Sequence, residues 1–528
     1  MQRALPSLIL LAAVSLGSLF FRLGALPLSG ADEPRYARIA QEMHEQGKWI
    51  TPVLEGKQWL EKPPLYYWMT SPIYSLFNSP ETVARIGPAI CALIAALAIF
   101  WLGATLWTRR AGLFGSLILL TSIGFAGYGR SASTDMPFTC CFTLAMTIFA
   151  LALGKNIGWK VMGAYVFLGL AVLGKGPVAI VLAAGIGIFI WFLDDRGITL
   201  RRWHILSGIT LTAAVSIPWF LLAFRQNGFS FIATFFINHN LARYITNIHH
   251  HSEPFYFYFF AVLVLLFPWS GWLLLLISKS PWHCLRRWRQ WHSGMLFLSC
   301  WFLFPLIFFS LSDSKLAGYI LPSLPPLALI LGVQLSRWTE AAVEPPRLRA
   351  SVYVYLILSA ALAVAAIYFF DKNYGGSWRT GLILSIAILA PALLAFWFGF
   401  RGNYLRAFSS TALQGLIIIL AIVQFAFPVL GKYHSAKDIA YRALELRQAG
   451  EPIVTYRFFH HSLNYYTAYQ ISRRLDDPES LQKFADAHPS FLVVTKSNEM
   501  KSLREIEGIL IEPLATQGDF HLVRVFRR

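Results

Sequence analysis

The chain has 528 residues, of which 56% are hydrophobic and 14% are charged, whereas ordinary soluble proteins have about 45–50% apolar and about 25% charged residues. This composition excludes a soluble globule as the form of the whole chain. The net charge of +18 does not indicate a nucleic-acid-binding domain, because the Lys and Arg residues lie in short loops between apolar runs. The few cysteines form no CxxC pattern, so neither a disulfide framework nor a zinc cluster is expected.

Long apolar runs, most near the roughly 20 residues that cross a hydrocarbon core, predict about thirteen transmembrane helices. We expect them near residues 4–26, 83–107, 111–128, 136–154, 160–173, 177–193, 204–224, 254–278, 294–311, 319–336, 351–370, 380–400 and 407–430. The first run has a basic flank at Arg3 but no clean small-x-small cleavage site, so it is predicted to be retained as a helix.

An odd number of crossings places the two termini on opposite sides of the membrane. If the N-terminus is cytoplasmic, the inner loops hold more than twice as many Lys and Arg residues as the short outer loops, which is the positive-inside pattern. The long first loop, residues 27–82, and the segment 431–528 then lie on the outer side of the membrane.

The segment 431–528 differs in character from the apolar domain 1–430 that precedes it. It alternates charged helical stretches with short β-like runs. The helical stretches are 436–448 and 478–487, and the β-like runs are 452–456, 491–495 and 520–525. We predict a small C-terminal α/β domain.

Two polar motifs lie in the first outer loop, Asp32-Glu33-Pro34-Arg35-Tyr36 and Glu61-Lys62-Pro63-Pro64. A loop of this length with its own amphipathic stretch, residues 36–46, is usually functional or interfacial. The Asp-Glu pair has two readings, since it can supply acidic groups to a site or cap a helix.

Two further outer motifs each offer one candidate residue, an acid in the first and a base in the second. Asp135 follows a Gly-Arg-Ser-Ala-Ser-Thr run and is either a helix N-cap or a site residue on the same face as Asp32. Lys175 lies between two glycines, which allow the backbone to approach an anion closely. A lysine that snorkels to the interface is the alternative.

The remaining motifs combine residues four apart, which share a helix face. His239 precedes Arg243 at this spacing, and His239 with a carboxylate from another loop is a better metal candidate than the three consecutive histidines at 249–251. Lys315 and Tyr319 offer an ammonium and a phenol that could grip one phosphate, unless they are only a loop lysine and an aromatic-belt tyrosine.

Together these motifs resemble those of the GT-C membrane glycosyltransferases of the protein O-mannosyltransferase superfamily. The resemblance is closest to the bacterial branch that moves 4-amino-4-deoxy-L-arabinose from undecaprenyl phosphate to lipid A. It rests on Asp32-Glu33-Pro34-Arg35-Tyr36-Ala37, Glu61-Lys62-Pro63-Pro64, Asp135, Leu173-Gly174-Lys175-Gly176-Pro177, His239-Asn240-Leu241-Ala242-Arg243, and Ser314-Lys315 with Tyr319 and Pro322. It implies an all-α polytopic GT-C fold in the bacterial inner membrane, acting as a monomer.

The resemblance also implies roles for individual residues. Lys62 and Arg243 would hold the donor phosphate, helped by Lys175, Lys315 and Tyr319. Glu61 and His239 would form a divalent metal site, for which zinc is favoured. The catalytic or sugar-binding carboxylates would be Asp32, Glu33 and Asp135.

The expected function is transfer of a sugar from a polyprenyl phosphate donor to a periplasmic acceptor, with lipid A as the first candidate. Transfer of another lipid-linked sugar to a protein or glycan hydroxyl is the alternative. A transporter or a lipid-binding protein would be a non-enzyme alternative, but a transporter favours broken helices at mid-membrane. Here the ionisable residues gather in outer loops.

Overall fold

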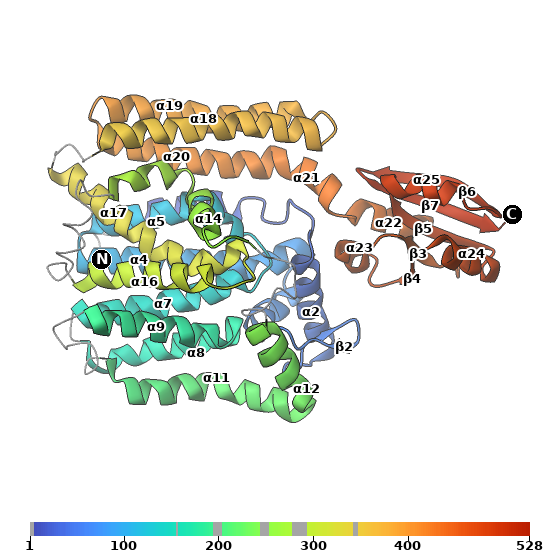
Figure 1. The fold of residues 1–528 in the computed structure, drawn as a ribbon, viewed down its shortest axis with the longest axis horizontal. Coiled ribbons are helices and arrows are strands. Elements are labelled where there is room, and N and C mark those ends of the chain that lie inside the picture. Colours follow the sequence, from blue (N-terminus) through green and yellow to red (C-terminus); the bar gives the residue numbers. More distant parts are fainter. Residues whose placement is uncertain are drawn as a thin grey trace.

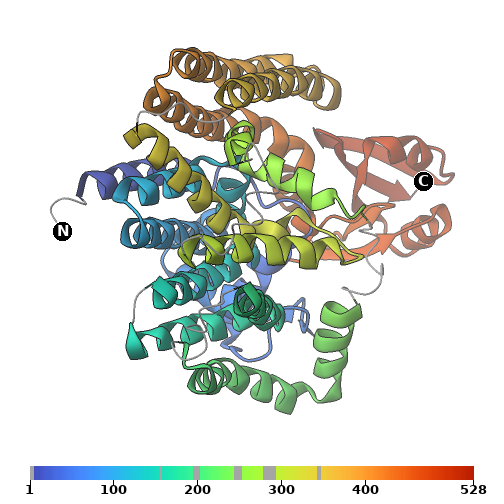
Figure 2. The same cartoon turned by 60° about the vertical axis from the view of Figure 1, so that its left-hand side comes forward.

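The computed structural model describes residues 5–154, 157–193, 203–242, 253–276, 293–341 and 347–527. A bundle of helices makes up most of the molecule, and a small α/β domain lies against one end of it (Figure 1). We call this end of the bundle the domain end and the opposite one the far end. The N-terminal helix starts at the far end, so the two termini lie at opposite ends of the molecule in both views (Figure 2).

Helices occur in every segment where the apolar runs predict one. They are α1 with η2 (Leu5–Phe20), α4 (Pro80–Leu106), α5 (Arg109–Thr121) with α6 (Ile123–Gly129), α7 (Asp135–Gly154), α8 (Met162–Lys175), α9 (Val178–Leu193), α11 (Ile205–Asn227), α14 (Phe257–Leu266) with η6 (Trp269–Leu276), α16 (Ser293–Ser310), η8 (Ala317–Ser323) with α17 (Leu324–Ala341), α18 (Leu348–Asn373), α19 (Trp378–Phe400), and α20 (Tyr404–Ala421) continuing through η9 (Ile422–Ala426) into α21 (Phe427–His434). Between α11 and α14, α12 (Phe229–Phe231) leads into the π-helix η5 (Ile232–Ala242).

Within the described residues, 8 helices are long and apolar enough to cross a membrane, or up to 10 if each of two bent pairs counts as one span. Shorter apolar helices include Leu5–Phe20 and Val178–Leu193. The all-helical membrane class is therefore confirmed, and thirteen crossings stay a prediction.

Two of the predicted spans are bent, which the apolar runs do not reveal. The α5–α6 pair bends by 69° and the α14–η6 pair by 117°. The two breaks meet, because the Ile123 amide donates to the Phe267 carbonyl over 2.9 Å. Gly124 allows this approach, since a Cβ there would lie 2.4 Å from Leu265. Pro268, which has no N–H for a helical bond, follows directly.

The first loop folds into α2 (Asp32–Gln46), the short hairpin β1 (Val53–Leu54) and β2 (Lys57–Gln58), then α3 (Leu65–Thr70) and η3 (Ser71–Ser75). The predicted amphipathic helix is confirmed: α2 buries one face that includes Tyr36, Ile39 and Met43. It ends at Gly47, whose left-handed φ of 66° closes the last turn on the Met43 carbonyl.

The predicted C-terminal α/β domain is also confirmed. Its five-stranded sheet has the order β4-β3-β5-β7-β6, in which β3 is parallel to β4 and β5 while β7 is antiparallel to β5 and β6. The strands are β3 (Ile453–Tyr456), β4 (Ile471–Leu475), β5 (Ser490–Lys496), β6 (Ile509–Gln517) and β7 (Phe520–Arg527), and the helices are α22 (Lys437–Leu446), α23 (His461–Tyr466), α24 (Pro478–Ala487) and α25 (Met500–Arg504). The sequence patterns missed β4, β6 and the two short helices α23 and α25.

The small domain is fastened to the first loop and to the start of α4. Buried Glu81 accepts a 2.7 Å hydrogen bond from the Tyr466 hydroxyl and pairs with Lys437 at 2.5 Å. The Leu28 amide donates to Tyr466 over 2.8 Å, and Ser435 donates back to the Leu28 carbonyl. One apolar core joins residues of α2 and α3 with residues of the small domain. The first loop is therefore held between the bundle and the α/β domain.

Candidate functional site

The two acids of the Asp32-Glu33 motif point into different surroundings. Glu33 is turned into the protein, where it pairs with Arg85 of α4 at 2.7 Å. It also accepts a 2.9 Å hydrogen bond from the Ala132 amide. Burial raises the pKa of the Glu33 carboxyl, but the charge and hydrogen bonds of Arg85 and two backbone amides outweigh burial and leave it below its ordinary value.

Arg85 completes this network from the other side. It is only 2% exposed and donates further hydrogen bonds to the carbonyl groups of Leu23, Leu26 and Pro27. The pair therefore joins α4, the start of the first loop and the turn before α7. This geometry gives Glu33 a structural task, and its predicted catalytic role stays untested.

Asp32 is exposed in the first turn of α2, where its 2.6 Å ion pair with Arg35 is solvated. The side chain of Ala31, the N-cap residue, cannot cap the helix, so Asp32 acts there only through the helix dipole. The Arg35 guanidinium lies over the ring of Trp59 at 5.2 Å.

Two buried tyrosines link the acidic motifs electrostatically. Burial raises the pKa of Tyr36 well above its usual range, with smaller electrostatic contributions from Asp32, Tyr67 and Asp135. Burial raises the pKa of Tyr67 in the same way, with smaller contributions from Tyr66, Glu61 and Asp32. The pKa values of this buried tyrosine pair therefore respond to carboxylates from three separate motifs.

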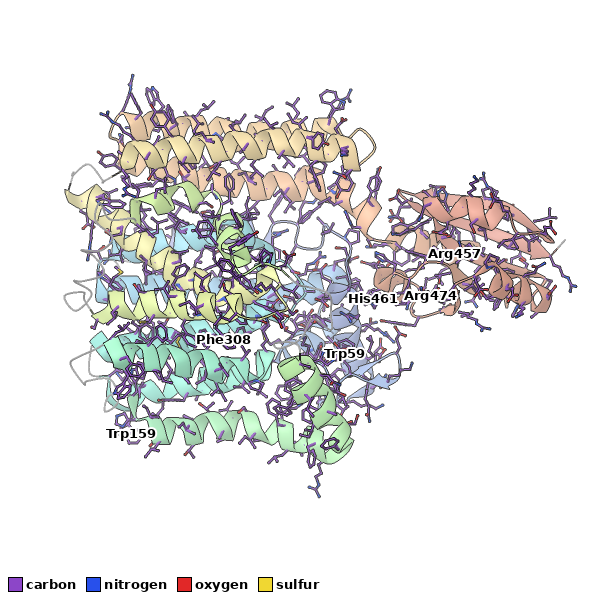
Figure 3. All side chains as sticks on the ribbon, viewed as in Figure 1. Trp59, Trp159, Phe308, Arg457, His461 and Arg474 are labelled. Carbon is purple, nitrogen blue, oxygen red and sulfur yellow. The ribbon has the colours of Figure 1, made fainter. Side chains whose placement is uncertain are left out.

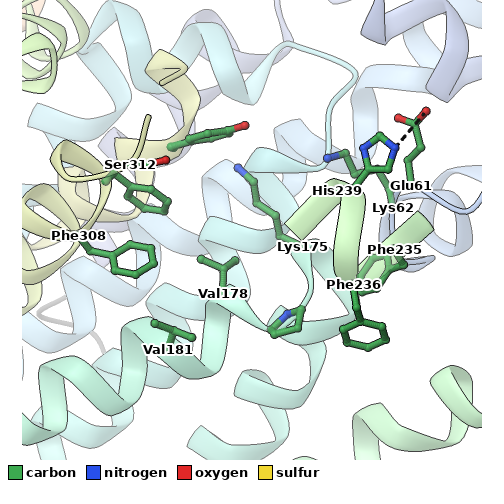
Figure 4. A pocket seen from close by; sticks show the side chains of 13 residues that line it. Glu61, Lys62, Lys175, Val178, Val181, Phe235, Phe236, His239, Phe308 and Ser312 are labelled. Atoms are coloured by element: carbon green, nitrogen blue, oxygen red, sulfur yellow. Dashed lines mark ion pairs between the residues drawn. The ribbon is translucent and has the colours of Figure 1, made fainter. Parts of the chain in front are cut away.

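A cavity of about 380 Å³ opens beside these motifs at the domain end (Figure 4). Its polar rim consists of Glu61, Lys62, Lys175, His239, Ser312 and Tyr319. Its walls are apolar and come from α9, the residue before it, η5 and α16: Pro177, Val178, Val181, Phe235, Phe236, Phe308 and Phe309. Such a shape suits a ligand with a charged head and a hydrocarbon tail.

Lys175 is placed on the rim by the end of α8. Gly176 turns the chain away with a φ of 90°, a conformation in which a side chain would be strained. The Lys175 ammonium forms an ion pair with Asp135 at the start of α7 and lies 4.7 Å from the centre of the Tyr319 ring. Asp135 therefore serves as the counter-charge of a cavity lysine.

Glu61 and His239 come together from distant parts of the chain, as the resemblance implies. Their Oε1 and Nε2 atoms are 3.8 Å apart across the rim (Figure 4). His239 is on the π-helix η5 and Glu61 precedes α3. Among the described residues, no group of three or more His, Cys, Asp or Glu side chains could hold a metal ion.

Among the predicted phosphate ligands, Lys315 and Arg243 are not placed at the cavity by the structure. Lys315 is 6% exposed and donates to the carbonyl groups of Ser312 and Glu253 at 2.5 and 2.9 Å. It is not among the residues that line the cavity. Arg243 and the histidines at 249–251 lie outside the described residues.

The motifs did not reveal the apolar walls or the partner of Glu33. Phe308 and Phe309 lie in a predicted membrane span, and Phe235 and Phe236 lie in an apolar run of a predicted outer loop, so neither pair indicates a ligand site. Arg85 is the one charged residue within its predicted helix, 83–107. A buried charge in an apolar run asks for a partner, and that signal could have identified the pair.

Known proteins share both sequence and fold with this chain. A family model described as "Dolichyl-phosphate-mannose-protein mannosyltransferase" matches residues 61–221. Undecaprenyl phosphate-alpha-4-amino-4-deoxy-L-arabinose arabinosyl transferase of Erwinia tasmaniensis is 31% identical over 347 residues, which cover 63% of this chain and 60% of the relative. The protein of the same name from Pectobacterium atrosepticum is 29% identical over 410 residues, with coverage of 74% and 72%.

The alignment with the first relatives is partial, since it spans 60% and 64% of the length of two of them. The structural match is almost complete. The crystal structure of ArnT from Cupriavidus metallidurans bound to undecaprenyl phosphate superposes with a TM-score of 0.79 at 22% identity, covering 98% of this chain and 97% of ArnT. The apo structure of the same protein gives the same TM-score.

The predicted resemblance is thereby confirmed in sequence and in fold: the chain is a multi-pass membrane protein with the GT-C fold of ArnT and is similar to the arabinosyl transferases of that branch.

Proposed function

We propose that the chain is a membrane glycosyltransferase that moves 4-amino-4-deoxy-L-arabinose from undecaprenyl phosphate to lipid A. The observation that carries the proposal is the cavity at the domain end, which combines lysines on its rim with apolar walls. The names of the similar proteins point to the same donor and sugar.

Donor binding uses both halves of the cavity. The phosphate lies on the rim between Lys62 and Lys175, while the first part of the polyprenyl chain lies against the phenylalanine wall. Asp135 holds the Lys175 side chain in place, and the ring of Tyr319 limits its movement on the other side. Arg243 remains a proposed phosphate ligand, and Lys315 is better explained as a structural lysine.

In the transfer step, an acceptor oxygen attacks the anomeric carbon of the sugar. The bond from that carbon to the phosphate oxygen breaks, and the electron pair leaves with the polyprenyl phosphate. The negative charge that develops on the leaving phosphate is stabilised by lysines in a site with little water. No nucleotide is needed, which suits a site outside the cytoplasm.

The acceptor decides what Asp32 does. A hydroxyl acceptor needs a general base, and the exposed Asp32 carboxylate suits that task. A lipid A phosphate is already anionic, and Asp32 would then pair with the ammonium of the amino sugar. We favour the second role because the similar arabinosyl transferases are named for an amino sugar, whose ammonium would need a counter-charge. The mannosyltransferase family model keeps a protein hydroxyl as the second candidate acceptor.

We also propose a divalent metal, with zinc favoured, between Glu61 and His239. Their 3.8 Å separation is close to the roughly 3.4 Å expected between two ligands of a tetrahedral zinc ion. A bound metal would supply a fixed positive charge at the phosphate. Activity that persists after treatment with a strong chelator, in protein shown to be metal-free, would refute the metal.

For orientation, we propose that the domain end faces the periplasm and the far end faces the cytoplasm of a bacterial inner membrane. The termini at opposite ends of the bundle support an odd number of crossings (Figure 1). We further propose that a single chain is the working unit.

The test combines purified full-length protein with undecaprenyl phosphate-linked 4-amino-4-deoxy-L-arabinose and lipid A in liposomes. Mass spectrometry should show lipid A with one added aminopentose and an equal amount of released undecaprenyl phosphate. Lys62→Ala should abolish both signals, while Lys160→Met, an exposed lysine outside the cavity, should leave them intact. Modification of an added protein or glycan, with lipid A unchanged, would favour the hydroxyl acceptor. No consumption of donor would refute the enzyme.

A further inference from the structure

A second cavity of about 470 Å³ lies within the bundle between α7, α8, α9, α11 and α16. Apolar side chains such as Phe149, Leu168 and Ile186 form most of its wall, and no charged side chain is among its lining residues. The hydroxyl of Tyr165 is turned to the Trp203 carbonyl at 2.9 Å. The cavity is therefore suited to a hydrocarbon chain.

The second cavity lies further along two helices that also wall the first, α9 and α16. On α16, Phe308 and Phe309 line the first cavity and Phe297, about three turns earlier, lines the second. The second cavity lies toward the far end, where Trp159 stacks on His204 next to Trp203. Figure 3 shows Phe308 in the middle of the bundle and Trp159 at its far end.

One stripe of α9 connects the two cavities. Val181 lines the first and Ile188 lines the second. Residues seven apart lie on the same side of a helix, here about 10 Å apart along its axis. Val181 is 43% exposed and Ile188 is 53% exposed, and Ala184 between them is also exposed. The stripe is open to the surrounding lipid.

We infer that the second cavity binds the distal part of the donor's polyprenyl chain, which runs from the first cavity along the α9 stripe. This inference rests on the proposed donor. The lysine rim fixes the phosphate at the domain end, so a long chain attached to it must leave along the apolar wall. The chain then follows α9, whose exposed side chains lead into the second cavity.

The expected energy is modest, for a physical reason. A chain that moves from lipid into an apolar cavity gains little from the hydrophobic effect, because lipid tails are equally apolar. The gain comes from close packing against the walls. The cavity should therefore distinguish long from short isoprenoid chains by a moderate factor.

Gly187 offers a clean way to fill the cavity. It lines the wall, and a Cβ added there would meet only a Trp203 ring carbon at 3.4 Å. Gly187→Leu therefore places four carbon atoms in the cavity without displacing backbone. Gly163→Leu is the matched control, because its Cβ would meet only the end of Ile148 at 3.4 Å and it lines neither cavity. Ala184→Leu repeats the test from the same wall.

The experiment measures binding of undecaprenyl phosphate and of geranylgeranyl phosphate to the full-length chain by native mass spectrometry. Wild type and Gly163→Leu should bind the long chain more tightly than the short one. Gly187→Leu should weaken the long chain about tenfold, which corresponds to about 1.4 kcal/mol, and leave the short chain unchanged.

Each other outcome overturns the inference in a recognisable way. Equal weakening of both lipids in Gly187→Leu would show a general loss of the site. Unchanged preference for the long chain, with loss of a co-purified phospholipid, would assign the cavity to that phospholipid. If wild type bound neither lipid phosphate, the proposed donor itself would fail, and the inference with it.

Discussion

Two carboxylate–cation pairs at the domain end differ in what surrounds them. Glu33 and Arg85 are enclosed by protein, and the guanidinium also donates to three backbone carbonyls. Asp135 and Lys175 also pair closely, but Lys175 borders the cavity. The first pair holds three segments together, while the second presents a cation to a ligand. Whether a carboxylate–cation pair is structural or binds a ligand therefore depends on whether protein or a cavity surrounds it.

The largest expected effect breaks the enclosed pair. Arg85→Met should lower the free energy of unfolding by about 3–5 kcal/mol, because it leaves Glu33 buried without its counter-charge. Arg35→Met is the matched control, since Arg35 pairs with the neighbouring Asp32 at the surface and should change stability by about 0–1 kcal/mol. Thermal unfolding in detergent measures both. Equal stability of the two variants would contradict the structural task of Glu33.

The next effect concerns the pair on the cavity. Lys175→Met should lower the transfer rate by about 10²–10³, because the leaving phosphate loses one of its cations. Its unfolding temperature should stay close to that of wild type. Lys160→Met serves as the control for removal of one lysine. If Lys175→Met instead lowered the unfolding temperature and kept the transfer rate, Lys175 would be a structural residue, as Arg85 is.

Asp32 sharpens the comparison with its neighbour Glu33. With a hydroxyl acceptor, Asp32→Asn should lower the single-turnover rate by about 10²–10⁴ and leave donor binding nearly unchanged. With an amino-sugar donor and a phosphate acceptor, donor binding should weaken instead, since the ammonium loses its counter-charge. Glu33→Gln should mainly lower stability. Donor affinity and single-turnover rate in the two variants decide between these cases.

The smallest effect is a pH dependence where the small domain meets α2. Burial, and then the positive charge of Arg35, lower the pKa of His461 to about 4, although Asp32 acts in the opposite direction. The unfolded chain takes up this proton at a higher pH than the folded one. The stability from neutral His461 is therefore full above its ordinary pKa of 6.5 and is lost as the pH falls toward 4.

His461→Gln should therefore remove part of the drop in unfolding temperature between pH 7 and pH 5, while wild type and variant unfold alike at the higher pH. The matched pH 7 values separate titration from a general loss of packing. An undiminished drop in the variant would assign the acid sensitivity to other groups.

Several predictions from the sequence agree with the structure because they depend on local pattern. The helix α2 follows the apolar spacing of residues 36–46 and stops at Gly47. The strands β3, β5 and β7 follow short β-like runs. In contrast, β4 (Ile471–Leu475) reads Ile-Ser-Arg-Arg-Leu and is mostly exposed. It is a strand because it pairs with β3 at the edge of the sheet. The local sequence pattern does not predict that pairing.

The same division applies to the site. Five residues singled out by the polar motifs of the sequence line the cavity: Glu61, Lys62, Lys175, His239 and Tyr319. Lys315 has the same residue type and a similar motif, yet backbone carbonyls take up its ammonium. The bend that brings α6 against α14 is also invisible in the apolar runs, because it involves a contact between residues 123 and 267, far apart in the chain.

Composition and apolar periodicity by themselves determined that this chain is a membrane protein of many helices with a small α/β domain at its end. They could do so because burial in lipid is a property of each segment. Only the tertiary structure decided which charges face the cavity, which are enclosed, and where a second cavity lies along α9. Those outcomes depend on partners far apart in the chain, such as Glu33 with Arg85 and Asp135 with Lys175.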